Sequence, residues 1–108
     1  MITMLIFAAL TGAPNSGVEF DLGEVNPATF SYVQTYTYCF EDAAIATKEA
    51  SQELRATRFE QCHSKRPALV TKYSSAAGPS EVRGLERSLN IIEKAYAKAM
   101  GVSLSESK

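Results

Sequence analysis

The only two cysteines of the chain, Cys39 and Cys62, limit its folding more than any other feature. The stretch between them is rich in helix-forming residues and contains neither glycine nor proline. In one unbroken helix their Cα atoms would lie about 34 Å apart, at a rise of about 1.5 Å per residue. A disulfide needs a separation below about 7 Å. Two arrangements remain: a helical hairpin that joins the cysteines in a bond, or two free thiols packed as small core residues.

The hairpin interpretation predicts a turn at residues 47–51. Bridged residues in an antiparallel helix pair lie about equally far from the turn, and the midpoint here falls between Ala50 and Ser51. Ser51 suits the N-cap of the second helix, because its hydroxyl can accept from a free backbone amide. A bond between the cysteines would stabilise the domain by about 3 kcal/mol in the chain-entropy description.

The helix before this turn has two apolar faces, at about 100° per residue. The first consists of Phe30, Val33, Thr37, Phe40 and Ala44, and the second of Tyr32, Tyr36, Cys39, Ala43, Ala46 and Ala50. Glu41 and Asp42 fall in the polar wedge that remains. Two apolar faces predict that two neighbouring segments cover this helix.

Proline, glycine and capping residues mark the other helix boundaries. Asn26 and Pro27 start the first helix, which runs to about Thr47. The second helix starts near Ser51 and ends or kinks before Pro67, because proline disfavours helix at the preceding residue.

Pro67 can open a further helical stretch to about Ala76, which Gly78 and Pro79 then end. The last helix is predicted to start with Ser80 as its cap and to end at Gly101. It carries the clearest apolar stripe of the chain, made of Val82, Leu85, Leu89, Ile92, Tyr96 and Met100. We find no sequence signal for a pair of strands.

The N-terminus is the part of the chain that bears on location. Residues 1–10 (MITMLIFAAL) are almost all apolar and too short to span a bilayer, which takes about 20 apolar residues. Residues 1–13 therefore suggest a signal peptide, although no lysine or arginine precedes the apolar run. The alternative is a short N-terminal helix or strand packed on the domain. The domain plan is a leader at 1–13, a linker at 14–25, a helical domain at 26–101 and a disordered tail at 102–108.

The charges are balanced overall but unevenly placed. A net charge of −1 and a pI near 5.8 give no electrostatic reason to expect a nucleic-acid or membrane partner. Residues 14–50 carry a balance of −5 and residues 51–73 a balance of +3. The simplest interpretation is that the two arms of the hairpin attract each other, with an anion-binding patch as the alternative. A possible binding surface consists of Tyr38, Arg55, Arg58 and Arg66.

The sequence contains none of the motifs that mark nucleotide-binding, hydrolase or zinc-protease sites. His63 follows Cys62, but neighbours on a helix point about 100° apart and do not form a nucleophile–base pair by adjacency. Together with Cys39 they would make a weak metal site without chelating spacing. We therefore expect no enzyme, no metal and no cofactor. A between-helix pocket formed by Arg55, Arg58 and Glu41 would reopen the question of an enzyme.

Three segments, CFEDAA, FEQCHSKRPALV and MITMLIFAALTGA, together resemble a loose class of small exported bacterial proteins of unknown function. In that class a hydrophobic leader precedes a helical hairpin with one cysteine in each arm. The resemblance implies export and a disulfide-linked hairpin, and it implies no activity and no functional residues.

These observations predict an all-α domain: a three-helix bundle, or a helical hairpin plus a third helix, cross-linked by one disulfide. The first functional hypothesis is a periplasmic or secreted protein with a structural or protein-binding role. The alternative is a cytoplasmic helical adaptor or regulator with reduced cysteines. A protein partner is open under both, no membrane span is expected, and the sequence does not determine the oligomeric state.

Overall fold

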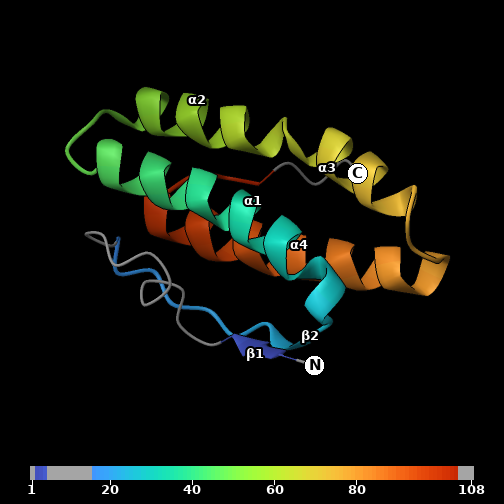
Figure 1. Cartoon of the computed structure of the whole chain (residues 1–108). Coiled ribbons are helices and arrows are strands. Elements are labelled where there is room, and N and C mark those ends of the chain that lie inside the picture. Colours follow the sequence, from blue (N-terminus) through green and yellow to red (C-terminus); the bar gives the residue numbers. More distant parts are fainter. Residues whose placement is uncertain (1, 5–15, 105–108) are drawn as a thin grey trace.

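The computed structural model describes residues 2–4 and 16–104. These residues form three helical rods and one small strand pair (Figure 1). The elements, in chain order, are β1 (Ile2–Met4), β2 (Gly23–Val25), α1 (Pro27–Ala46), α2 (Gln52–His63), α3 (Arg66–Ser74) and α4 (Pro79–Met100). The first rod is α1, the second is α2 followed by α3, and the third is α4. The prediction of an all-α bundle is confirmed.

The second rod is broken because of Pro67. Proline has no backbone N–H to donate to the carbonyl four residues earlier, so α2 ends at His63 and α3 begins at Arg66. At the break, the Lys65 N–H donates instead to the Cys62 carbonyl at 3.1 Å. The predicted kink is therefore confirmed, and it places His63 and Arg66 close together at the middle of the rod.

The disulfide joins the first two rods. Cys39 of α1 and Cys62 of α2 have their Cα atoms 5.7 Å apart and are bonded through their sulfurs. The connection is the predicted turn, and the Ser51 hydroxyl accepts from the Leu54 N–H as the N-cap of α2. The hairpin interpretation is confirmed, and α1 and α2 run antiparallel.

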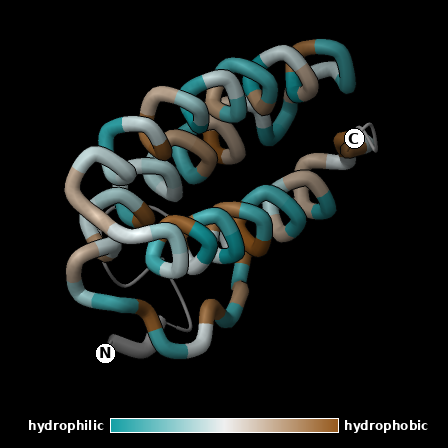
Figure 2. The backbone as a smooth tube through the Cα atoms, turned by 90° about the vertical axis from the view of Figure 1, so that its right-hand side faces the viewer, coloured by the Kyte–Doolittle hydropathy of each residue, from teal (hydrophilic) through white to brown (hydrophobic). Residues whose placement is uncertain are grey.

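The third rod runs parallel to the first. Two hydrogen bonds, Tyr36 to Glu93 and Tyr96 to Glu41, join α1 and α4, and residue numbers rise in the same direction along both helices. As predicted, α1 is covered from more than one side, by α2, α3 and α4. The hydropathy changes repeatedly along each helix in Figure 2, as expected for amphipathic helices. The most buried large side chains lie between the rods: Val33, Tyr36, Phe40, Leu85, Leu89, Ile92 and Tyr96.

The last helix starts earlier than predicted. Its N-cap is Gly78 and Pro79 is its first residue, so the assignment of the cap to Ser80 is wrong. Pro79 already has the backbone φ of a helix, and the carboxylate of Glu81 accepts from the Gly78 N–H at 2.9 Å. At the other end Gly101 has φ of 71°, a left-handed conformation that glycine adopts easily and that ends the helix as predicted.

The segment before α1 packs on the bundle. Leu22 and Val25 are buried, and the Phe20 ring lies 5.9 Å from the Tyr96 ring. The expectation of no strand pair is wrong, because β2 pairs antiparallel with β1, with Ile2 opposite Val25. The proposed leader falls largely on residues 1 and 5–13, which lie outside the described residues, as does the end of the tail, 105–108.

Candidate functional site

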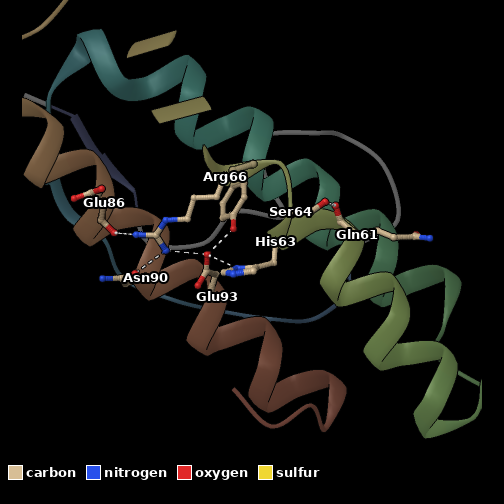
Figure 3. A network of polar contacts seen from close by, with 8 residues as sticks. Gln61, His63, Ser64, Arg66, Glu86, Asn90 and Glu93 are labelled. Carbon is tan, nitrogen blue, oxygen red and sulfur yellow. Dashed lines mark hydrogen bonds and ion pairs between the residues drawn. The ribbon is translucent and has the colours of Figure 1, made fainter. Parts of the chain in front are cut away.

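Glu93 on α4 carries a buried carboxylate and is only 6% exposed. One of its oxygens, Oε2, accepts from three side chains on three other helices (Figure 3). The Tyr36 hydroxyl of α1 donates at 2.5 Å and the Arg66 guanidinium of α3 at 2.9 Å. His63 Nδ1, at the end of α2, lies 3.1 Å away. We call Glu93, Tyr36, His63 and Arg66 the Glu93 cluster.

Arg66 extends this cluster along α4. Its Nη1 also donates to Asn90 Oδ1 at 2.7 Å, and its Nη2 to the Glu86 carbonyl at 3.4 Å. Figure 3 shows the guanidinium lying between Glu86, Asn90 and Glu93. The break at Pro67 thus places Arg66 beside α4, where its positive charge compensates the buried carboxylate of Glu93.

A second buried carboxylate, Glu41 on α1, lies further along the same two helices. It is 4% exposed, and its Oε1 accepts from the Tyr96 hydroxyl at 2.6 Å and from the Ser16 hydroxyl at 2.7 Å. Its Oε2 accepts from the Ser16 N–H at 2.7 Å. We call Glu41, Tyr96 and Ser16 the Glu41 cluster. The sequence places Glu41 in the polar wedge of this helix, and it is buried there because Ser16 and Tyr96 cover it.

The two tyrosines respond to burial in the same way. Burial, reinforced by the hydrogen bond to Glu93, raises the pKa of the Tyr36 hydroxyl well above its usual value. Burial, reinforced by the hydrogen bond to Glu41, raises the pKa of the Tyr96 hydroxyl in the same direction. Both hydroxyls therefore stay protonated and act as hydrogen-bond donors to the carboxylates.

The predicted binding residues do not form one surface. Arg55 is used inside the fold, since its side chain donates to the Ala50 carbonyl at 3.3 Å and to the Met100 carbonyl at 3.2 Å. Tyr38 is half-buried against the core. Arg66 belongs to the Glu93 cluster. We expected the two hairpin arms to attract each other, but within the described residues α1 and α2 form no ion pair with each other. Arg66, which does form an ion pair, reaches Glu93 of α4.

Arg58 is the predicted binding residue that faces a cavity beside the disulfide. A pocket of about 370 Å³ is lined by Thr35, Cys39, Asp42, Arg58, Gln61, Cys62 and Lys65. Within residues 2–4 and 16–104, neither Arg58 nor Lys65 forms an ion pair. Glu41 and Arg55 do not line this pocket, so it does not bring together the three residues that would have suggested an enzyme.

The Glu93 cluster has part of the geometry of a catalytic pair. A carboxylate that binds one ring nitrogen of a histidine orients the ring, and the His63 side chain is 41% exposed. However, in the described part of the chain no serine, threonine or cysteine side chain is hydrogen-bonded to His63. The main role of the Glu93 cluster is therefore to join four helices through Oε2 of Glu93.

The described residues contain no group of three or more histidine, cysteine, aspartate or glutamate side chains placed to hold a metal ion. Within these ranges, none of the helices combines the length and apolar character that crossing a bilayer requires. Cys62 points to α1 and His63 to α4, as the 100° rule predicts for neighbours on a helix.

Comparison with known proteins gives no relative: no family model, no curated protein and no solved structure matches this chain. The site is therefore described from its own residues.

Sequence reasoning missed the burial of both carboxylates. For Glu93 a signal existed, because Leu89, Glu93, Tyr96 and Met100 follow the same four- and three-residue spacing as the apolar stripe. An acid inside that stripe indicates a buried carboxylate with partners. For Glu41 no comparable signal existed, since its covering residue Ser16 comes from the segment before the helices.

Proposed function

We propose that this chain is a small exported helical protein with a structural or protein-binding role, whose fold is cross-linked by one disulfide. The observation that carries the proposal is the Cys39–Cys62 bond between α1 and α2. Disulfides persist in oxidising compartments and are rare in the reducing cytosol. The apolar stretch at residues 1–10 supports the same location.

The contacts within the fold support a structural or binding role over a catalytic one. The conspicuous buried polar groups, Glu93 and Glu41, each accept hydrogen bonds from donors in other parts of the chain. Arg58 and Lys65 are the basic side chains of the pocket beside the disulfide that are left available for a partner. A protein partner with an acidic contact surface would complement them.

The experiment is the intact mass of the protein purified from its native host, measured with and without reduction and alkylation. We expect a mass that lacks the leader, and two alkyl groups that are added only after reduction. A full-length mass with both cysteines alkylated without reduction would contradict export and the bond together. Cys39→Ser/Cys62→Ser is the matched control for the alkylation.

One observation favours the second candidate, a cytoplasmic helical adaptor. Residues Ile2–Met4 pair with Gly23–Val25, which is the packed N-terminus that the alternative requires. Cleavage of a leader would remove β1 and leave β2 without its partner strand. The mass measurement separates the candidates, because the adaptor keeps residues 1–13 and its thiols are free.

A further inference from the structure

The disulfide is accessible from one side through the pocket of about 370 Å³ beside it. Both cysteines line the pocket, but they differ in exposure. Cys39 is half-buried, whereas Cys62 is only 3% exposed. Cys39 is therefore the cysteine residue that is more open to a molecule entering the pocket.

The charges around the two sulfurs also differ. Arg58 lies four residues before Cys62 on α2 and so shares its face, whereas Lys65 lies in the break between α2 and α3; both line the same pocket. Asp42 lies three residues after Cys39 on α1 and lines the pocket too. A thiolate at Cys62 is thus stabilised by two neighbouring cations, and a thiolate at Cys39 is opposed by a carboxylate.

We propose that this pocket is a thiol–disulfide exchange site for small anionic thiols, with attack at Cys39 and Cys62 as the leaving group. The two cations and one carboxylate give the pocket a net positive charge, which favours thiols that carry carboxylates, such as glutathione. The proposal requires the Cys39–Cys62 bond but does not require export, so it goes beyond the function proposed above.

The exchange balances as follows. The thiolate sulfur of the small molecule attacks Cys39 Sγ and forms a new S–S bond, while the Cys39–Cys62 bond breaks and its electron pair leaves on Cys62 Sγ. The incoming sulfur is oxidised to a mixed disulfide on Cys39 as Cys62 is reduced to a thiolate. A second thiolate can then attack the mixed disulfide, releasing the small-molecule disulfide and a second protein thiolate at Cys39, which takes a proton from water.

The site of attack is tested with the oxidised full-length chain and reduced glutathione. Early time points are quenched with N-ethylmaleimide and digested with trypsin, which separates the peptides of Cys39 and Cys62 at Arg58 and Lys65. We expect glutathione on Cys39 and the maleimide on Cys62. Glutathione mainly on Cys62, or evenly on both, would overturn the assignment.

The role of the charges is tested with Arg58→Gln/Lys65→Gln against the charge-matched control Lys72→Gln/Lys98→Gln, in which both replaced lysines are exposed and away from the pocket. Rates are compared per thiolate for glutathione and for cysteamine, a cationic thiol. We expect the pocket variant to react with glutathione about three- to tenfold more slowly and the control to be nearly unchanged. Equal slowing of both thiols, or no slowing of glutathione, would overturn the proposal.

A measurement on the unmodified chain covers the case in which the pocket variant does not fold. The distance over which charges interact in salt solution, the Debye length, is about 10 Å at 0.1 M and becomes shorter as the salt concentration rises. Raising the salt concentration should therefore slow glutathione and speed cysteamine. The same salt response for both thiols would contradict electrostatic selection at the pocket.

Discussion

Glu93 and Glu41 are both buried carboxylates, but different groups donate hydrogen bonds to them. Tyr36 of α1 donates to Glu93 of α4, and Tyr96 of α4 donates to Glu41 of α1. Glu93 also has the guanidinium of Arg66 and the ring of His63. Glu41 has the hydroxyl and the backbone N–H of Ser16.

The difference shows how burial of a charge can be compensated. In the Glu93 cluster an opposite charge comes from the kink in the second rod, and removal of the carboxylate leaves that charge partly buried without its partner. In the Glu41 cluster the donors are neutral and come in part from the segment that precedes α1. The first cluster connects the three rods, and the second fastens the N-terminal segment to them.

The largest expected effect comes from removing the charge of each carboxylate in turn. Glu93→Gln should lower the free energy of unfolding by about 3 kcal/mol, because Arg66 loses its ion pair. Glu41→Gln should lower it by about 1 kcal/mol, because no cation is left unpaired and one hydrogen bond is lost. Urea unfolding of the oxidised protein measures both. Equal losses would contradict the distinction between the clusters.

Alkaline pH should affect the two clusters alike. The folded state raises the pKa of Tyr36 and of Tyr96, mainly through burial, so the unfolded chain loses these protons first, near pH 10. Stability is therefore fully present below pH 10 and falls above it, by up to about 1.4 kcal/mol per pH unit for each tyrosine.

The slope of stability against pH between pH 9 and 11 checks this expectation. Tyr36→Phe and Tyr96→Phe should each remove one tyrosine's share of the slope, while Tyr73, whose pKa is also raised by burial, keeps its share in both variants. A slope unchanged in both variants would show that neither hydroxyl is kept neutral by the fold.

Removing the neutral donor of the Glu41 cluster should have a smaller effect. Ser16→Ala deletes one hydrogen bond to Glu41 but keeps the backbone one, so the expected loss is about 1 kcal/mol or less. Hydrogen exchange of the amides of residues 16–25 should quicken more than that of α4. Ser74→Ala, at an exposed serine of α3, is the matched control. Faster exchange throughout the bundle would argue against a local fastening.

The smallest effect is expected at the exposed edge of the Glu93 cluster. His63→Gln should change stability at pH 7 by about 0.5 kcal/mol or less, because the histidine side chain is 41% exposed and Arg66 still pairs with Glu93. The measurement is the urea midpoint beside that of Glu93→Gln. A loss as large as that of Glu93→Gln would make His63 the main partner of the carboxylate.

The sequence was sufficient for the fold because the fold depends on local signals. The cysteine spacing left a disulfide-linked hairpin as one of two arrangements, Ser51 marked its turn, and Pro67 marked the kink. The stripe of α4 marked the third rod. Two features were missed: the cap of α4, where Pro79 outweighed Ser80, and the pairing of β1 with β2.

The partners of the two carboxylates were not predictable because these contacts join residues far apart in the chain. Tyr36 and Glu93 are separated by 57 positions, and Tyr96 and Glu41 by 55. A helical wheel gives the direction of Glu41 on its own helix but does not indicate that Ser16 covers it. Likewise, the arginines were predicted as a surface, whereas Arg55 and Arg66 are used to join the second rod to α4.

The parallel packing of α1 on α4 has a consequence for the kinetics of folding. Parallel neighbours cannot be joined by a short turn, so forming the Tyr36–Glu93 contact closes a loop of 57 residues. In the oxidised chain the disulfide shortens this loop by the 23-residue separation of its cysteines, to about 34 residues. The entropy of loop closure then favours the oxidised chain by a factor of about two in the rate of this step. The Cys39–Cys62 disulfide should thus also speed the packing of α4 against α1 during folding.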